Sequence, residues 1–330
     1  MIRIATYEDI PQIMKFINDY WKAGHILARD KEFFEYMYRD NDKVNFVVSV
    51  SDAGVLEGIL GFIPYGKGKN YDIMDALWKV IPTDNPHLGI DLLRYVTKLP
   101  DVRIVASPGI NEKTIPIYKW MGYYVGKFVQ WYRINDKYNK DKFVIAKIEN
   151  FKNAEIISEQ WNWKEIVDFQ EFQKELNTDI YCKSKAKPFK ELDFINKRYF
   201  EHPRFKYRIW GLYNPEKQIE TFFVTRKQEY LGASAIRVID CIGNRNAILY
   251  ATKMFDEIVV NENAEYIDFF EAGIEDEVLE KAGWMKVEDS GNIIPDYFAP
   301  FVQNNNDIYY FSTDEKAILF KGDGDQDRPS

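Results

Sequence analysis

A short helix-ending pattern occurs twice in this chain of 330 residues and indicates an internal duplication. The segment YKWMGY at 118–123 aligns with LEKAGW at 279–284, and in each copy a glycine takes the position that usually closes a helix. A strand-like run and a Gly-Ile pair precede both copies, at 109–110 and 273–274. Self-similarity on this scale predicts two copies of one fold, and the chain is long enough to hold them.

The order of the expected elements agrees with a duplication. In the first half, apolar periodicity predicts strands at 2–5, 44–50, 56–63, 75–81, 102–106 and 123–134, with helices at 13–21, 33–38 and 88–96 and one ending at 121. The second half has expected helices at 163–176, 189–200, 247–259 and 275–282, and strands at 205–213, 219–225, 234–241, 266–271, 308–312 and 317–320.

We therefore expect the α/β (α+β) class, with two domains that each contain a mixed, mostly antiparallel sheet flanked by helices. The predicted divisions are a first domain at 1–135, a linker and strand at 136–160, and a second domain at 161–330. The polar tail KGDGDQDRPS at 321–330 is typical of a disordered end.

Composition excludes several classes of protein. The net charge of −8 disfavours a nucleic-acid partner, which normally requires a basic surface. Two cysteines and three histidines without metal-ligand spacing predict neither a disulfide framework nor a metal site. The start MIRIA does not resemble a signal peptide, and no apolar run approaches about 20 residues, the length that spans a bilayer. The sequence thus predicts a cytoplasmic protein without membrane insertion.

Four segments of the first half occur in a recognisable order. They are IRIATYEDI at the start, WKVIP at 78–82, HLGIDLL at 87–93 and NEKTIPIYKWMGY at 111–123. Gly89 permits close backbone approach at the start of a helix, where free amides and the helix dipole favour a phosphate. Together the segments resemble the GNAT superfamily of acyl-CoA-dependent N-acyltransferases. Asp84 and His87 replace residues that the coenzyme A loop of that family usually has.

The resemblance implies two tandem GNAT-like domains, of which the first binds acyl-CoA. The diphosphate would lie on the helix that begins near residue 88, and the pantetheine arm would run between the strands at 78–81 and 102–106. A backbone amide near Val80 would stabilise the thioester oxyanion. The implied acyl-CoA-binding residues are Trp78, Val80, His87, Leu88, Gly89, Ile90 and Asn111.

Tyr118 and His25 are the candidate catalytic residues. In the family that the chain resembles, a tyrosine at this place often protonates the departing thiolate. The second copy has Leu279 there, so the first half is the expected active one. His25 lies in a loop between two predicted helices and could deprotonate an amine at neutral pH. A core aromatic and a helix-terminal histidine are the structural alternatives, and Asp72, Asp75 or water are the other possible bases.

The length, the tandem arrangement and the segment KGDGDQDRPS at 321–330 also resemble bacterial sugar N-acyltransferases. These enzymes act on nucleotide-linked amino sugars for surface polysaccharides, the lipopolysaccharide O-antigen among them. The nearest such group acylates a dTDP-linked 3-amino-3,6-dideoxyhexose from acetyl-CoA or 3-hydroxybutanoyl-CoA. A nucleotide diphosphate needs cations with aromatic neighbours. The expected acceptor-binding residues are Asp75, Arg198, Tyr199, His202, Tyr207, Arg208 and Arg237, for which a solvated basic strand edge is the alternative.

Other functions stay open at this stage. Some tandem proteins of this kind transfer residues from aminoacyl-tRNA to cell-wall peptide, and the acidic net charge counts against that activity. Acylation of a peptide or protein amine is a further alternative. So is a non-catalytic scaffold that binds coenzyme A, which the changes at Asp84 and His87 would suit.

Overall fold

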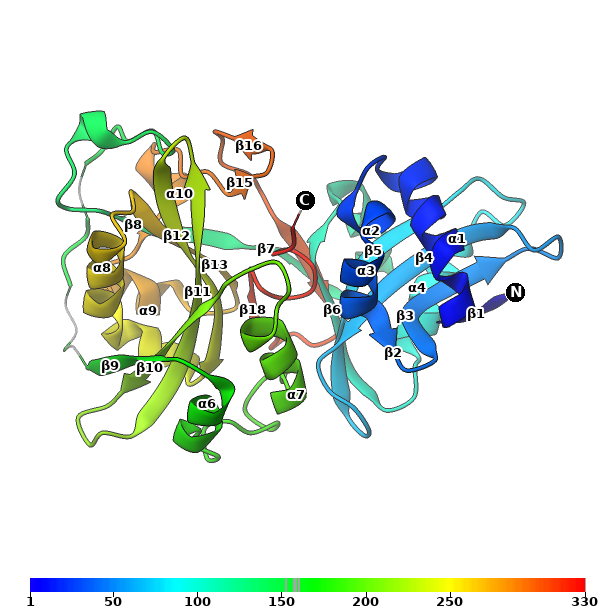
Figure 1. Ribbon diagram of the computed structural model, residues 1–330, viewed down its shortest axis with the longest axis horizontal. Coiled ribbons are helices and arrows are strands. Elements are labelled where there is room, and N and C mark those ends of the chain that lie inside the picture. The colour runs from blue at the N-terminus through cyan, green and yellow to red at the C-terminus, as the bar shows by residue number, and fades with distance from the viewer. Residues whose placement is uncertain (152, 157–158, 160, 330) are drawn as a thin grey trace.

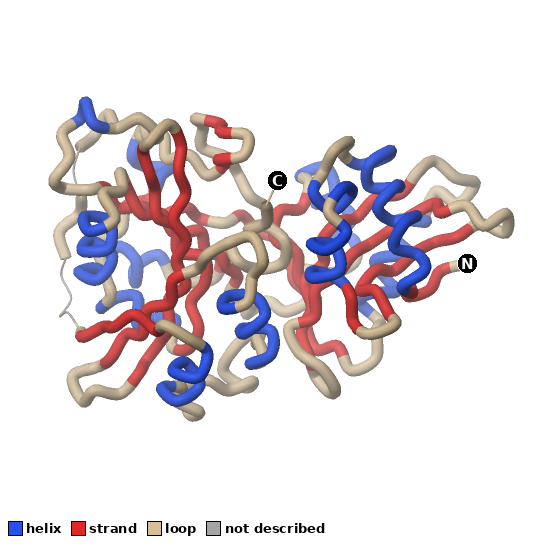
Figure 2. The backbone as a smooth tube through the Cα atoms, in the orientation of Figure 1, coloured by secondary structure: helices blue, strands red, loops and turns tan. Residues whose placement is uncertain are grey.

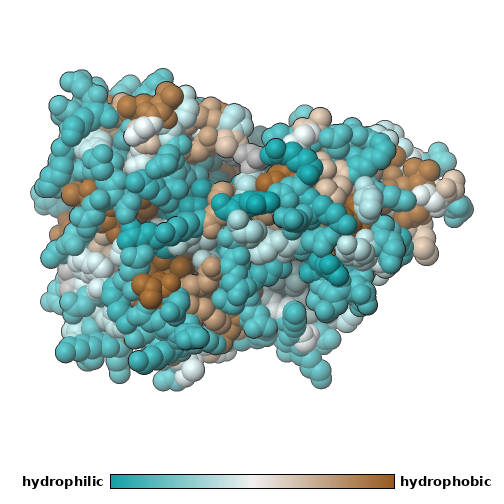
Figure 3. Space-filling model, in the orientation of Figure 1, coloured by the Kyte–Doolittle hydropathy of each residue, from teal (hydrophilic) through white to brown (hydrophobic). Residues whose placement is uncertain are grey.

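The computed structural model describes residues 1–151, 153–156, 159 and 161–329. Residues 152, 157–158 and 160 of the predicted linker, and residue 330 of the tail, lie outside the described part. Two halves lie side by side along the long axis of the molecule, and the C-terminal segment runs between them (Figure 1). Each half has strands at its centre with helices and loops around them (Figure 2). Hydrophilic residues cover most of the face in Figure 3.

The first sheet has the order β1-β3-β4-β5-β6-β17-β7, with β2 paired to β3. Its strands are β1 (Ile2–Thr6), β2 (Arg39–Asp40), β3 (Lys43–Val50), β4 (Leu56–Pro64), β5 (Tyr71–Val80), β6 (Val102–Ile110), β7 (Tyr124–Lys127) and β17 (Tyr309–Ser312). Its paired strands are antiparallel except β5 and β6, which are parallel. One face packs against α1 (Ile10–Phe16), α2 (Ile26–Arg29) and α3 (Lys31–Tyr38), the other against α4 (Leu88–Thr97) and α5 (Ile115–Trp120).

The second sheet has the order β14-β8-β13-β12-β11-β10-β9, with β18 paired to β13. Its strands are β8 (Val129–Ile134), β9 (Asn162–Ile166), β10 (Arg208–Tyr213), β11 (Ile219–Tyr230), β12 (Ala233–Gly243), β13 (Tyr266–Ala272), β14 (Met285–Lys286) and β18 (Leu319–Phe320). One face packs against α8 (Thr252–Asn261) and α9 (Asp276–Lys281), the other against α6 (Phe169–Glu175) and α7 (Leu192–Ile195). The short α10 (Val287–Ser290) and a hairpin of β15 (Tyr297–Phe298) and β16 (Phe301–Val302) complete this half.

The duplication predicted from the sequence is visible in the topology. Each sheet contains one parallel pair, β5 with β6 in the first and β12 with β13 in the second. The strands beyond that pair follow the same plan, β17 then β7 in the first sheet and β8 then β14 in the second. The predicted α/β (α+β) class with two mixed, mostly antiparallel sheets is therefore confirmed.

The two halves exchange strands. β17 comes from the C-terminal part of the chain but pairs with β6 and β7 of the first sheet. β8 directly follows β7 in the chain but pairs with β13 and β14 of the second sheet. The expected single strand at 123–134 is thus two strands that turn from one sheet into the other at Phe128. Because each half completes the other, the halves are held together by main-chain hydrogen bonds as well as by packing.

The segment predicted as a helix at 163–176 has a different structure at its start. Asn162–Ile166 forms β9, which pairs with β10 along five residues, and α6 begins only at Phe169. Asp168 caps this helix, since its carboxylate accepts a hydrogen bond from the Glu171 amide at 2.8 Å. The prediction of one helix was wrong because Trp163, Lys164 and Glu165 suit either structure, and the free edge of β10 decides between them.

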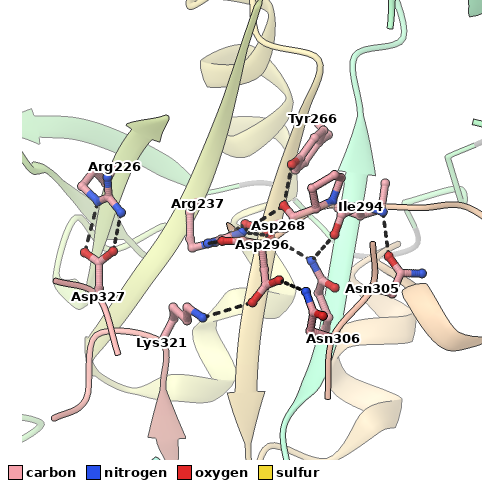
Figure 4. A network of polar contacts seen from close by, with 12 residues as sticks. Arg226, Arg237, Tyr266, Asp268, Ile294, Asp296, Asn305, Asn306, Lys321 and Asp327 are labelled. Atoms are coloured by element: carbon pink, nitrogen blue, oxygen red, sulfur yellow. Dashed lines mark hydrogen bonds and ion pairs between the residues drawn. The ribbon is translucent and has the colours of Figure 1, made fainter. Parts of the chain in front are cut away.

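The tail at 321–329 is also ordered, contrary to the expectation from its polar sequence. Asp323, Asp325 and Asp327 are each at most 5% exposed. Lys190 and Tyr65 hold the Asp323 carboxylate, at 2.9 and 2.7 Å. Arg226 forms an ion pair with Asp327 (Figure 4), and the Tyr207 hydroxyl donates to the same carboxylate. The polar tail is buried because cations and hydroxyl groups from both halves compensate its carboxylates.

Candidate active site

The parallel pair of the first sheet splits partway along its length. β5 and β6 pair only from Tyr71 to Met74, against Val102 to Ala106. Beyond this point β5 pairs with β4 and β6 with β17, and no described strand lies between β5 and β6. The Ser107 hydroxyl donates to the Asp75 carbonyl at 3.1 Å at the point of separation. The split leaves the inner edges of both strands free to pair with an extended ligand.

Helix α4 begins just beyond the open end of β5. His87 is its N-cap residue and is exposed, and Leu88 lies buried below it. Gly89 lies against the Trp78 indole, since a Cβ at residue 89 would be 3.1 Å from the Trp78 ring. Gly89 and Ile90 are in the first turn, where amides have no partner within the helix. The structure therefore brings five of the predicted acyl-CoA-binding residues to one end of the split.

Val80 and Asn111 take different positions. Val80 is the last residue of β5, and its pairing in the sheet is with Gly58 of β4, on the side away from the split. Asn111 is exposed, and its side chain caps the turn before α5 by accepting from the Lys113 amide at 2.9 Å. The Asn111 side chain is thus used locally.

Asp75 lies where the strands separate. A β-bulge interrupts the β4–β5 ladder between the pairs Leu60–Trp78 and Phe62–Asp75, and bulges commonly redirect a side chain beside an active site. Asp75 is 4% exposed, and its Oδ1 has no hydrogen-bond partner. Burial raises the pKa of this carboxyl well above its ordinary value. A buried, unpaired carboxyl group is costly, which makes Asp75 a candidate functional residue.

Tyr118 lies on the same face of the first sheet as Asp75. It is 3% exposed, with its ring 6.0 Å from that of Trp78 and stacked on Phe311 at 4.1 Å. Burial, and then the charge of nearby Asp75, raise the pKa of its hydroxyl. Phe311 belongs to β17, so the strand exchange completes the packing around Tyr118. The core-aromatic alternative and the catalytic prediction are both compatible with this position.

His25 has structural partners on both ring nitrogens. Nδ1 lies 3.2 Å from the Leu27 amide at the start of α2, and Nε2 lies 3.3 Å from Nε of Arg328 in the tail. Burial, and then the charge of Arg328, lower the pKa of His25 to about 3. The imidazole is therefore neutral near pH 7 and is a weak base. These contacts favour the helix-terminal alternative for His25.

Asp72, the other carboxylate considered as a base, forms an ion pair. Both of its oxygens accept from the Arg103 guanidinium, and Oδ2 also accepts from the Phe189 amide at 2.7 Å. These bonds tie β5 and β6 to the second half. Asp72 is thus a structural residue, which leaves Asp75 as the carboxylate that is not engaged in an ion pair.

The corresponding split of the second sheet is filled by the chain itself. β12 and β13 pair only from Ile236 to Val238. Beyond this point β18 pairs with the end of β13, and the Gly322 amide donates to the Ile239 carbonyl at 2.8 Å. A Cβ at Gly322 would lie 2.8 Å from that carbonyl oxygen, so only glycine fits. Among the described residues, the chain itself therefore pairs with the strand edges where this split begins, unlike in the first half.

Of the predicted acceptor-binding residues, four gather next to the tail. Arg198 donates to the Asp327 carbonyl at 2.6 Å, and Tyr207 donates to the Asp327 carboxylate at 2.8 Å. Tyr199 and His202 both contact the Tyr207 ring edge-on. The structure thus brings these four together between the two halves.

Arg208 and Arg237 lie elsewhere. Arg208 forms ion pairs with Glu165 and Glu262. Arg237 is 1% exposed and forms a two-point ion pair with Asp268 inside the second sheet (Figure 4). The structure therefore places these two arginines apart from the other four.

Sequence reasoning missed the partners of the tail. Lys190 bridges Asp240 and Asp323, at 2.7 and 2.9 Å, in the interior between the halves. Alternating aspartates and glycines at 322–327 were the available signal, because one face of an extended segment can then carry every carboxylate. None of these residues lies near a motif in the sequence.

The helices of the described residues are all too short or too polar to span a bilayer. Within the same residues, no group of three or more His, Cys, Asp or Glu side chains is arranged to hold a metal ion.

Comparison with known proteins identifies the fold. No protein-family model and no curated protein sequence matches the chain. Among solved structures, a GCN5-related N-acetyltransferase from Anabaena variabilis is similar over 94% of this chain and 72% of its own, with a TM-score of 0.57 and 11% identity. A probable N-acyltransferase from Enterococcus faecalis covers the same shares, with a TM-score of 0.57 and 12% identity. The chain therefore has the GNAT fold along nearly its whole length.

Proposed function

We propose that this protein is an acyl-CoA-dependent N-acyltransferase whose first half carries the chemistry. The observation that carries the proposal is the difference between the two splits. The first is open, with Asp75 unpaired at its closed end, and the second is filled by β18 and Gly322. Acyl-CoA is the substrate whose extended pantetheine arm suits free strand edges and whose diphosphate suits the first turn of α4.

In the proposed reaction, the acceptor amine attacks the thioester carbon directly. A C–N bond forms, the C–S bond breaks, and coenzyme A leaves as a thiolate. Asp75 takes the proton that the amine loses, for which its raised pKa makes it a stronger base than an ordinary aspartate. Tyr118 donates its proton to the thiolate. Because burial disfavours a phenolate at Tyr118, the proton held by nearby Asp75 would restore the hydroxyl.

We further propose that the acceptor is a nucleotide-linked amino sugar, such as a dTDP-linked 3-amino-3,6-dideoxyhexose, and that the acyl group is acetyl or 3-hydroxybutanoyl. The support is the cluster of Arg198, Tyr199, His202 and Tyr207 between the halves, which offers a cation and aromatic rings. This acceptor class also rests on the resemblance to sugar N-acyltransferases of surface polysaccharide synthesis.

The test is release of free thiol from acetyl-CoA and 3-hydroxybutanoyl-CoA in the presence of nucleotide-linked amino sugars. We expect release that depends on the acceptor and that falls at least about a hundredfold in Asp75→Asn, since a general base contributes about 10²–10⁴-fold. Calorimetry with coenzyme A would show whether this variant still binds the donor product.

The alternatives appear as distinct outcomes of the same assay. Release with peptide amines but not with any sugar would replace the acceptor class. Binding of coenzyme A without thiol release, whichever acceptor is added, would indicate a scaffold. Absence of coenzyme A binding would contradict the proposed function itself.

A further inference from the structure

A cleft of about 690 Å³ lies between the two halves, apart from the split. The first half lines it with Tyr36 at the end of α3, Lys43 at the start of β3, and Lys67 in the β4–β5 loop. The second half contributes Lys197 and Arg198, and the tail contributes Gly324. The cleft therefore exists only because the halves are docked, and a ligand in it would touch both.

Arg198 is a buried cation without a carboxylate partner. It is 4% exposed, and within the described chain it forms no ion pair. One nitrogen donates to the Asp327 carbonyl, while Nε and the other terminal nitrogen have no partner. The Asp327 carboxylate itself is used by Arg226 and Tyr207. A buried guanidinium with two unused donors is unfavourable unless an anion completes it.

Lys197, next to Arg198, adds a second cation. Its ammonium group lies 5.1 Å from the centre of the Tyr36 ring. Burial, and then repulsion from Lys67 across the cleft, lower the pKa of Lys197. The Lys67 ammonium group forms a long ion pair with Asp40, at 3.9 Å. An anion between these lysines would relieve their repulsion and satisfy Arg198 at the same time.

The cleft lies at the opposite end of β5 from the start of α4. Tyr71, the first residue of β5, lines the cleft, whereas α4 begins after Val80, the last residue. Phe62 lines the cleft as well and is the register partner of Asp75. At about 3.3 Å per residue, Asp75 is about 13 Å along β5 from Tyr71. A donor from the α4 end and an acceptor from the cleft could therefore meet at Asp75.

We propose that this cleft binds the phosphate or diphosphate group of the amine acceptor, with Arg198 and Lys197 as its cations. The inference rests on the proposed function, because it assigns the acceptor of that reaction a place. It adds Tyr36, Lys43 and Lys67 of the first half to a site whose predicted cations all lay in the second half. The acceptor is thereby a small phosphate-bearing molecule that bridges the halves.

The test measures binding rather than activity. Inorganic pyrophosphate, dTDP and thymidine are titrated by calorimetry into the protein saturated with coenzyme A, so that the diphosphate site of the donor is occupied. We expect pyrophosphate and dTDP to bind and thymidine to bind much more weakly. Lys197→Gln should weaken both by about tenfold or more, the effect of losing one charge-assisted hydrogen bond. Arg198→Gln should weaken them further.

Arg208→Gln is the matched control, since that arginine is paired with Glu165 and Glu262 away from the cleft. It should leave pyrophosphate and dTDP binding unchanged. Should Arg198→Gln fail to fold, Lys197→Gln and Lys67→Gln decide the question, because both lysines retain contact with solvent.

Two results would overturn the proposal while leaving the proposed function intact. One is loss of pyrophosphate binding once coenzyme A saturates the protein, which would assign the anion to the donor site. The other is a dTDP affinity that equals the affinity for thymidine, or that is the same in wild type and in Lys197→Gln. Failure to bind coenzyme A would instead contradict the proposed function.

Discussion

Replacing Asp327 with asparagine tests how strongly the buried tail is held against the second half. The Asp327 carboxylate accepts from Arg226 of β11 and from the Tyr207 hydroxyl, and its carbonyl accepts from Arg198. Asparagine keeps the shape and one carbonyl oxygen but removes the charge. The guanidinium of Arg226, which is 12% exposed, then loses its anion.

The magnitude follows from the pKa of Asp327. Burial alone would raise this pKa, but the charge and hydrogen bonds of Arg226 outweigh burial and lower it from 3.8 to about 2. At about 1.4 kcal/mol for each pKa unit, ionised Asp327 contributes on the order of 2 kcal/mol to the free energy of unfolding. Leaving a partner charge buried costs about 3–5 kcal/mol in a dry interior. The residual exposure of Arg226 favours the lower figure, so we expect a loss of about 2–3 kcal/mol.

Because the folded pKa is depressed, the stabilisation is fully present above pH 3.8 and is lost as the pH falls through about 2. Urea unfolding followed by tryptophan fluorescence between pH 5 and 7 should therefore give a constant difference between wild type and Asp327→Asn. Glu277→Gln, which removes an exposed partner of Lys281, should leave the urea midpoint unchanged. A loss below about 1 kcal/mol for Asp327→Asn, or equal effects of the two variants, would refute this reasoning.

Four further variants test individual residues. Asp75→Asn should reduce turnover yet raise the urea midpoint at pH 7, because a carboxyl with a raised folded pKa stabilises the protein only at low pH and loses that contribution as the pH rises; an unchanged midpoint would argue that Asp75 is not desolvated. Tyr118→Phe should lower kcat for thiol release more than it weakens coenzyme A binding, and near-normal turnover would remove this hydroxyl from the mechanism. His25→Ala should cost about 1 kcal/mol in urea unfolding as a lost helix cap and leave the pH–rate profile unchanged; a shifted profile would restore it as the base. Gly322→Ala should destabilise by about 1–3 kcal/mol, because its Cβ would meet the Ile239 carbonyl; wild-type stability would contradict the filling of the second split by the tail.

Part of the arrangement of the candidate active site follows from the sequence alone, and that part is local. Trp78, His87, Leu88 and Gly89 come together because a strand, a short loop and a helix start follow one another in the chain. Asp75 was one of several possible bases in the sequence. Both carboxyl groups are buried, and the missing partner of the Asp75 Oδ1 distinguishes it from Asp72, which Arg103 neutralises. A carboxylate does not reveal in the sequence which cation will reach it.

The acceptor side illustrates the opposite case. Arg198 and Arg208 are ten positions apart in one basic stretch, but one lies in the interior and the other on a paired surface. Lys43 and Lys67 belong to the first half and Lys197 to the second, so docking of the halves is needed to bring all three to one cleft. Such proximity has no periodicity that a sequence could display.

Helix ends, strand alternation and turn residues act over a few positions, so the amino-acid sequence was enough to predict the duplication, the order of most elements and the turn between β3 and β4. The exchange of β8 and β17 between the sheets, the strand β9 and the filling of the second split by the tail follow from long-range contacts. These outcomes depend on which free strand edge is available and on which buried cation meets a carboxylate. Both are properties of segments far apart in the chain, because hydrogen-bond partners and buried charges are satisfied across the whole fold.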